Sequence, residues 1–513
     1  MADPLNMEAS GVADTADLAQ GASVSLLGRI AGRALHLLTQ ISVGRLFGPQ
    51  AYGLYAIGQT ILRLAGLVSV LGMDTAVVRY GSRFYPESPG RLRGVLAIGI
   101  GFPLVAGAAV GGAILLAARW FAVEVFNDPS LTPVLRWFAL GIGPLAGLQA
   151  SAAATRISKR MQFSVLSEEL TQPALALLLI LAAVFVGMGL IGASAATVLS
   201  IGATLLIALY FVQKLFPQAK GEDKATEAPW REILLFSLSV SGSRIFIMLI
   251  TWIDRLVLGS FRPAAEVGIY QAAAQSSVLF AIILGAFNSI FSPIVADLWH
   301  RGERHRLEAA FRISTKWGFY LSLPFFVVIW LAPVQVLTVV FGSEYAEGAL
   351  ALMILAAGQL VNAGTGAVGL LLSITGYQRR WVLAAGVMLA LDLVLILTLV
   401  PRYGMLGAAI ATAGSLGGLF LIGLVQVRGA LALWPYDRRY LKGLVSVVAS
   451  AAVVYWLARF PFTQTLPGLT LVTLASVGLF VLILLILGLD AEDRQFVALV
   501  RSHATRFWSA ANG

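Results

Sequence analysis

Residues 18–43 read LAQGASVSLLGRIAGRALHLLTQISV, a stretch long and apolar enough to cross a membrane as one helix. It nevertheless carries Arg29, Arg33 and His36. At 3.6 residues per turn, these three residues and Gln40 fall on one narrow face of the helix. A cation at the centre of a bilayer costs about 3 kcal/mol on insertion scales and usually faces a bundle interior or an aqueous cavity. The polar face therefore predicts a cavity that binds a negatively charged group.

The composition of the whole chain is that of an integral membrane protein. Of its 513 residues, 58% are hydrophobic and 12% are charged, about half the charged fraction of a typical soluble domain. Apolar runs of about 20 residues predict an all-α polytopic protein with fourteen spanning helices. These lie near 18–43, 55–79, 94–118, 134–155, 170–188, 190–213, 233–257, 267–296, 313–332, 348–373, 381–400, 404–427, 440–458 and 468–488.

Lysine and arginine are distributed unevenly between alternate loops. One set of loops holds clusters of them, at 83–93, 156–160, 214–231, 301–312, 379–380, 428–442 and 494–506. The opposite set holds only Arg45, Arg119, Arg262, Arg402 and Arg459. Because cytoplasmic loops retain positive charge, we expect the first set and both termini to be cytoplasmic. The acidic start before residue 18 does not resemble a cleavable signal peptide.

Several other functions are disfavoured by what the sequence lacks. The net charge of +10 is spread over short loops and forms no compact basic domain, so nucleic-acid binding is not expected. The chain has no cysteine, which excludes disulfides and thiol chemistry. It also has no P-loop and no zinc-binding spacing. We therefore expect no cofactor, no metal and no ATP hydrolysis.

The most polar internal stretch, KLFPQAKGEDKATEAPWRE at 214–232, contains charges of both signs and two prolines. It predicts a linker between two lobes. The expected organisation is a cytoplasmic N-terminal tail over 1–17, an N-lobe of six helices over 18–213, the cytoplasmic linker over 214–232, a C-lobe of six helices over 233–427, a terminal helix pair over 428–488 and a cytoplasmic tail over 489–513.

A weak internal repeat supports the two lobes. The letters RL at 45–46 and GLY at 53–55 recur as RL at 255–256 and GIY at 268–270. Aligning Arg45 with Arg255 places Arg33 opposite Ser243, one residue from Arg244. Six helices per lobe would make this a parallel repeat about an axis along the membrane normal, with a site at the lobe interface.

Arginines in the spans are the main candidates for substrate binding. The seventh segment carries a second polar face made by Ser237, Ser241, Arg244, Thr251 and Arg255. Arginine suits a phosphate because its planar fork donates two parallel hydrogen bonds and stays charged in a poor solvent. A cluster of three suits a diphosphate. The candidate substrate-binding residues are Arg29, Arg33, His36, Arg63 and Arg244.

Each candidate also has a structural explanation. Arg29 could snorkel toward the cytoplasm, and His36 could be a hydrogen-bonded interior histidine. Arg33 and Arg244 could pair with buried carboxylates. Gly28 and Gly32, which flank Arg29, have the spacing that allows helices to pack closely.

Carboxylates within the predicted spans are few. Asp392 lies in the middle of a segment with no basic residue near it in sequence. It is a candidate ion-coupling group, and the alternative is that it pairs with a cavity arginine. Asp74 with Arg79, and Asp254 near the outer end of its helix, are expected to form local structural pairs.

Three stretches carry a family resemblance. RLFGPQAYGLY at 45–55, continued by LGMDTAVVRY at 71–80, resembles the start of bacterial polysaccharide transporters, the O-antigen and exopolysaccharide repeat-unit flippases. GMLGAAIAT at 404–412 resembles a later part of the same proteins. The similarity spans most of the chain, and its specificity comes from the order of these short motifs together with the topology.

The resemblance implies a fold like that of the multidrug and toxin extruders (MATE), with two six-helix lobes around a cleft. It implies a substrate, an oligosaccharide attached through diphosphate to undecaprenol, flipped across the bacterial inner membrane by alternating access. The implied partners are membrane lipids and polysaccharide assembly proteins such as a polymerase. Related flippases for lipid-linked peptidoglycan precursors use cavity arginines, which Arg29, Arg33 and Arg244 match in helix and approximate depth.

Two competing functions remain. A cation-coupled multidrug exporter of the same fold would favour a cavity rich in carboxylates and aromatic residues, against the excess of arginine here. A membrane-embedded polysaccharide polymerase, ligase or glycosyltransferase would need a sizeable outer loop or catalytic domain, and the predicted outer loops are short.

Overall fold

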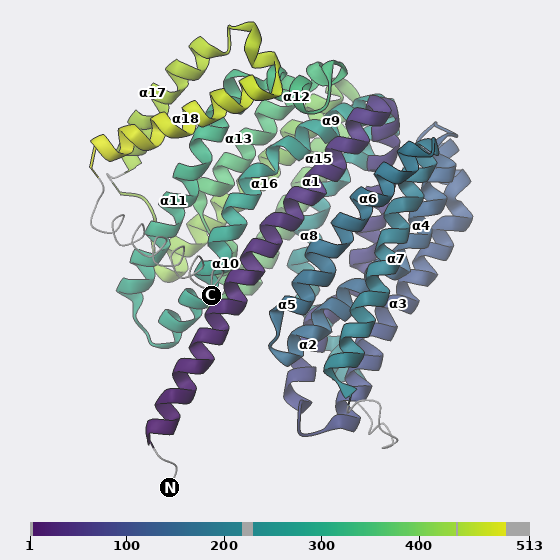
Figure 1. The fold of residues 1–513 in the computed structure, drawn as a ribbon, viewed down its shortest axis with the longest axis vertical. Helices are drawn as coiled ribbons and strands as arrows, with labels where there is room; N and C mark the ends of the chain where they lie inside the picture. Colours follow the sequence, from purple (N-terminus) through teal and green to yellow (C-terminus); the bar gives the residue numbers. More distant parts are fainter. Residues whose placement is uncertain (1–3, 218–228, 438–439, 489–513) are drawn as a thin grey trace. The chain divides into compact units, whose positions relative to one another are not determined.

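The computed structural model describes residues 4–217, 229–437 and 440–488, and every regular element in these ranges is helical (Figure 1). The predicted C-terminal tail, 489–513, lies outside the described residues, as does 218–228 of the predicted linker. The all-α prediction is thus confirmed over the described part of the chain.

The first half of the chain forms seven α-helices with short π and 3-10 turns between them. These elements are α1 (Pro4–Val70), α2 (Met73–Phe84), α3 (Pro89–Trp120), η1 (Phe121–Val125), α4 (Leu131–Thr155), η2 (Arg156–Ser158), α5 (Met161–Ser164), η3 (Val165–Thr171), α6 (Gln172–Phe185) and α7 (Gly189–Leu215).

The second half continues with helices of similar length and ends in an antiparallel pair, α17 and α18 (Figure 1). Its elements are α8 (Trp230–Phe261), α9 (Ala264–Ser277), α10 (Leu279–His300), α11 (Arg304–Leu331), α12 (Pro333–Val340), η5 (Ser343–Gly348), α13 (Ala349–Thr365), α14 (Val368–Ile374), α15 (Gln378–Tyr403), α16 (Met405–Leu431), α17 (Tyr440–Leu457), η6 (Pro461–Gln464) and α18 (Leu466–Ile486).

Helix α1 contains a break that separates the first two predicted segments. Gly48 has φ 76° and ψ 174°, a conformation that a residue without Cβ adopts readily, and Pro49 follows it. The second predicted segment, 55–79, extends past the end of α1 at Val70 into α2. The two segments are therefore distinct helices joined at a sharp bend.

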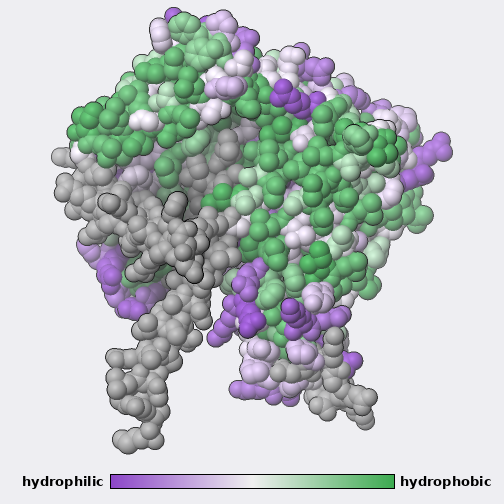
Figure 2. Space-filling model, in the orientation of Figure 1, coloured by the Kyte–Doolittle hydropathy of each residue, from purple (hydrophilic) through white to green (hydrophobic). Residues whose placement is uncertain are grey.

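The surface of the long helices is suited to lipid. Eleven stretches of the described residues are long and apolar enough to cross a membrane. Large apolar side chains are exposed on them, such as Phe185 at 94% and Leu116 at 88%. Figure 2 shows such apolar residues, in green, over much of the described surface in this view. Exposure of this kind on uninterrupted helices is what contact with lipid chains requires, and the chain is a multi-pass membrane protein.

Two compact units make up the structure. Unit 1 comprises Met1–Gln275 with Ala385–Ser415, and unit 2 comprises Ser276–Ala384 with Leu416–Gly513. This partition is not the predicted division into six-helix lobes, which stays a prediction. All candidate site residues, from Arg29 to Asp392, belong to unit 1.

Matched contacts within unit 1 support the internal repeat. An added Cβ at Gly53 of α1 would lie 1.7 Å from the carbonyl oxygen of Ala264, and one at Gly268 of α9 would lie 2.0 Å from that of Pro49. The two glycines of the repeated motif thus face each other's helix. Gly53 and Gly268 are separated by 215 positions in the sequence, and so are Pro49 and Ala264.

A pair of tyrosines follows the same offset. The hydroxyl of Tyr55 lies 2.8 Å from the Thr197 hydroxyl. Tyr270 and Thr412, each 215 positions later, both donate to the carboxylate of Asp254. The tyrosine and threonine of the first pair thus recur in the second, where a buried acid lies between them.

Candidate functional site

Arg29 lies on α1 and forms an ion pair with Glu169 of η3, with 3.8 Å between Nε and Oε1. Close packing brings the two elements together. An added Cβ at Gly32 would lie 1.9 Å from the carbonyl oxygen of Glu169, and one at Gly28 would lie 2.2 Å from Cγ1 of Val165. The close approach predicted for these two glycines is confirmed, and it places a carboxylate beside Arg29.

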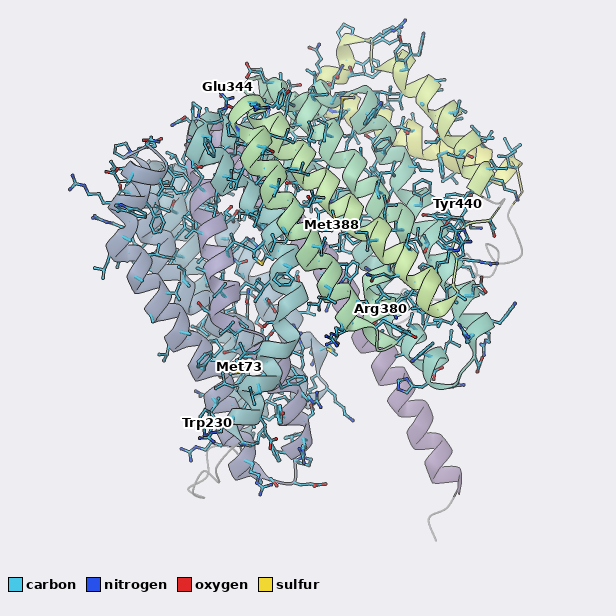
Figure 3. The ribbon with its side chains drawn as sticks, turned by 180° about the vertical axis from the view of Figure 1, so that it is seen from behind. Met73, Trp230, Glu344, Arg380, Met388 and Tyr440 are labelled. Atoms are coloured by element: carbon cyan, nitrogen blue, oxygen red, sulfur yellow. The ribbon has the colours of Figure 1, made fainter. Side chains whose placement is uncertain are left out.

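Arg244 of α8 forms a salt bridge with Asp74 at the start of α2. Figure 3 shows Met73, the residue before Asp74, at the same end of unit 1 as Trp230, where α8 begins. The predicted local pair between Asp74 and Arg79 is wrong, because the Arg79 guanidinium instead lies 4.3 Å from the ring centre of Phe236. Arg244 is thus paired with a partly buried carboxylate, and its role in substrate binding stays a prediction.

A third carboxylate connects these two ion pairs. Glu168 lies 3.5 Å from Arg156 and interacts electrostatically with Glu169, Asp74 and Arg244. Three arginines and three carboxylates of unit 1 thus form one charged network, made of Arg29, Arg156, Arg244, Asp74, Glu168 and Glu169.

His36 and Arg63 form a second group on the two arms of α1. Nε2 of His36 lies 3.3 Å from a terminal nitrogen of Arg63. Arg33 is exposed one turn before His36 and interacts with it electrostatically. The Arg63 guanidinium lies 5.0 Å from the ring centre of Trp252, and that of Arg255 lies 4.9 Å from the same indole. Arginines stack favourably on such faces, so Trp252 joins the two cations.

Asp254 is a fully buried carboxylate with a complete set of partners. One oxygen accepts from Arg255 at 2.6 Å, and the other accepts from Tyr270 at 2.5 Å and Thr412 at 3.0 Å. Arg255 also donates to Gln271 at 2.8 Å. The expected local structural pair at Asp254 is confirmed.

Asp392 of α15 is also fully buried, but its environment is different. Neither of its oxygens has a hydrogen-bond partner in the part of the chain that the structure describes. Ser415 of α16 lies beside it without hydrogen-bond geometry, and Asp254 interacts with it electrostatically. The alternative in which Asp392 pairs with a cavity arginine therefore does not hold among the described residues. The position 215 residues earlier is occupied by Leu177.

The candidates thus fall into distinct places. Arg29 and Arg244 belong to the charged network, and Asp392 is buried beside Ser415. His36 contacts Arg63, which stacks on Trp252, and Arg33 interacts electrostatically with His36. Sequence reasoning missed Glu168 and Glu169 because they fall just before the predicted segment 170–188. Their π-helical backbone has no signature in the hydropathy pattern.

Comparisons with known proteins identify the family of the chain. The family model described as "Polysaccharide biosynthesis protein" matches residues 18–299. The probable low-salt glycan biosynthesis flippase Agl15 of Haloferax volcanii is 26% identical over 163 residues. That alignment covers 32% of this chain and 34% of Agl15, so the chain spans about a third of that relative's length.

Solved structures of membrane transporters are similar to this fold. The lipid II flippase MurJ in an inward closed conformation is similar with a TM-score of 0.70 at 14% identity, over 90% of this chain and 96% of that one. An inward-facing multidrug resistance MATE family transporter is similar with a TM-score of 0.65 at 16% identity, over 80% of this chain and 98% of that one. The MATE-like fold is confirmed, whereas the fourteen spans and the two six-helix lobes around a cleft stay predictions.

Proposed function

Since the chain belongs to the polysaccharide biosynthesis protein family, we propose that it is a flippase for undecaprenyl-diphosphate-linked oligosaccharide repeat units. It translocates them across the bacterial inner membrane for surface polysaccharide synthesis. It works by alternating access of two six-helix lobes, with fourteen spans and both termini cytoplasmic. It is a transporter rather than an enzyme, and it delivers its substrate to assembly proteins such as a polymerase.

The observation that carries this proposal is the concentration of arginines within the helices of unit 1. Arg29 and Arg244 are both about half exposed, at 46% and 53%. A cation within a spanning helix is unfavourable unless it meets water, a counter-ion or an anionic ligand. Guanidinium groups that remain accessible are suited to bind a diphosphate through paired hydrogen bonds. Similarity to a structure titled lipid II flippase supports a lipid-linked substrate.

Asp392 is proposed as the ion-coupling residue. A buried carboxylate without hydrogen-bond partners is unfavourable unless it gains a proton or a metal cation. The neighbouring hydroxyl of Ser415 provides a further oxygen atom, and the negative charge of Asp254 favours a cation at Asp392. Uptake and release of a cation at Asp392 would therefore link an ion gradient to the movement of the lobes.

Deletion of the gene followed by lipid extraction tests the function. We expect loss of surface polysaccharide and accumulation of undecaprenyl-diphosphate oligosaccharide in the cytoplasmic leaflet. Normal polysaccharide together with altered dye efflux would instead identify a multidrug exporter and refute the proposal.

Single substitutions test the site. Arg33→Ala and Arg244→Ala should each reduce polysaccharide export by about tenfold or more without loss of protein from the membrane, because each removes a guanidinium group proposed to bind the diphosphate. Arg306→Ala is the matched control, since Arg306 is 70% exposed and pairs with Glu303 outside unit 1. Full export by both test variants would refute the proposed diphosphate site.

A further inference from the structure

Two arginines of the proposed diphosphate site are already in contact with carboxylates from other elements. Arg29 pairs with Glu169 of η3, and Arg244 pairs with Asp74 of α2. In both pairs the carboxylate is the more buried member, at 34% against 46% and at 13% against 53%. The carboxylates are therefore the less accessible members of the pairs, while each guanidinium group keeps about half of its exposure.

A carboxylate and a phosphate use the same face of a guanidinium. Both accept two parallel hydrogen bonds from its planar fork, so they compete for one position. Partly exposed ion pairs contribute little free energy, and a diphosphate carries more negative charge than a carboxylate. A bound diphosphate can thus replace Glu169 or Asp74 without a large energetic barrier.

We propose that Glu169 and Asp74 are built-in counter-ions. They pair with Arg29 and Arg244 when the site is empty, and the diphosphate headgroup displaces them when it binds. This inference rests on the proposed function. The inference gives the two acids a role in specificity, because a neutral headgroup cannot displace them. It also gives them a role in release of the substrate.

Release follows from the third acid of the network. Glu168 already interacts electrostatically with both Asp74 and Glu169. Displacement therefore leaves three electrostatically interacting carboxylates of which two have lost their arginine partners, and like charges repel. Return of Glu169 and Asp74 to their arginines relieves this repulsion and favours departure of the headgroup. The acids thus lower affinity and increase turnover.

The test is binding of undecaprenyl diphosphate to the purified full-length chain in lipid nanodiscs. Asp74→Asn and Glu169→Gln keep the shape of each side chain and remove its charge. We expect each variant to bind about two- to fivefold more tightly than the wild type, as expected for loss of a competing, partly exposed ion pair. Undecaprenol, which lacks phosphate, should show no gain.

Asp297→Asn is the matched control, because it removes the carboxylate of an exposed ion pair with Arg301 outside unit 1. Its affinity should equal that of the wild type. If Asp74→Asn does not fold, Glu169→Gln decides alone, since Glu169 is the more exposed acid.

The outcomes separate the two proposals. Binding by the wild type with equal or weaker binding by the folded variants would overturn the counter-ion inference and leave the flippase proposal standing. A wild type that does not bind undecaprenyl diphosphate would overturn the proposed function, and the inference with it.

Discussion

Asp392 illustrates how a single residue can be unfavourable for stability and valuable for function. It is fully buried without a hydrogen-bond partner among the described residues, whereas the first half of the repeat has Leu177 at the matching position. Asp392→Leu should therefore raise stability by about 1–3 kcal/mol and abolish acceleration of flipping by an imposed proton or sodium gradient. Thermal unfolding and flipping in proteoliposomes measure the two effects. A less stable variant that still responds to both gradients would contradict the proposed role.

The residues that the sequence could and could not identify differ in a physical way. Arg29, Arg33 and His36 stand out because a charge within an apolar run is energetically unusual. The partner of Arg244 could not be read from sequence, since Asp74 lies 170 positions away. Helix geometry disfavours an ion pair between Asp74 and Arg79, because residues five apart on a helix do not share a face.

At the scale of elements, the contact between α1 and α9 depends on the absence of two side chains. Gly53→Ala would place a Cβ 1.7 Å from the carbonyl oxygen of Ala264, and backbone cannot yield as a side chain does. We expect this substitution to destabilise the protein by about 1–3 kcal/mol through overpacking. Fluorescence-detected thermal unfolding of the purified chain measures the change.

Gly101→Ala in α3 is the control for that experiment, because nothing lies within 4 Å of a Cβ added there. It should leave stability unchanged or raise it by up to about 1 kcal/mol, since alanine favours helix over glycine. Equal unfolding temperatures for the two variants would show that α1 and α9 do not meet at Gly53. The repeated letters GLY and GIY indicated that these positions correspond, but only the fold shows that their glycines face each other's helix.

At the scale of the whole molecule, the fold class could be predicted from composition because a bilayer leaves the backbone few alternatives to the helix. Hydropathy predicts that the second segment ends at 79, whereas the helix stops at Val70. A hydropathy window averages over such a turn, since Leu71 is apolar and Gly72 is small. The predicted division into six-helix lobes could not be tested from the hydropathy pattern either. Packing between helices that are distant in the chain leaves no local signal in the sequence.

The topology itself is open to a direct test, because the chain contains no cysteine and any introduced thiol is unique. The distribution of lysine and arginine predicts that Glu87 and Gln378 are cytoplasmic and that Ser130 and Gln464 face outward. All four side chains are exposed. Membrane-impermeant maleimide should therefore label Ser130→Cys and Gln464→Cys in intact spheroplasts, and Glu87→Cys and Gln378→Cys only after permeabilisation. Labelling of Glu87→Cys or Gln378→Cys in intact spheroplasts would show that the orientation is the reverse of the predicted one. The proposed substrate is loaded from the cytoplasm, and the arginines of unit 1 would then receive its diphosphate from the wrong side of the membrane.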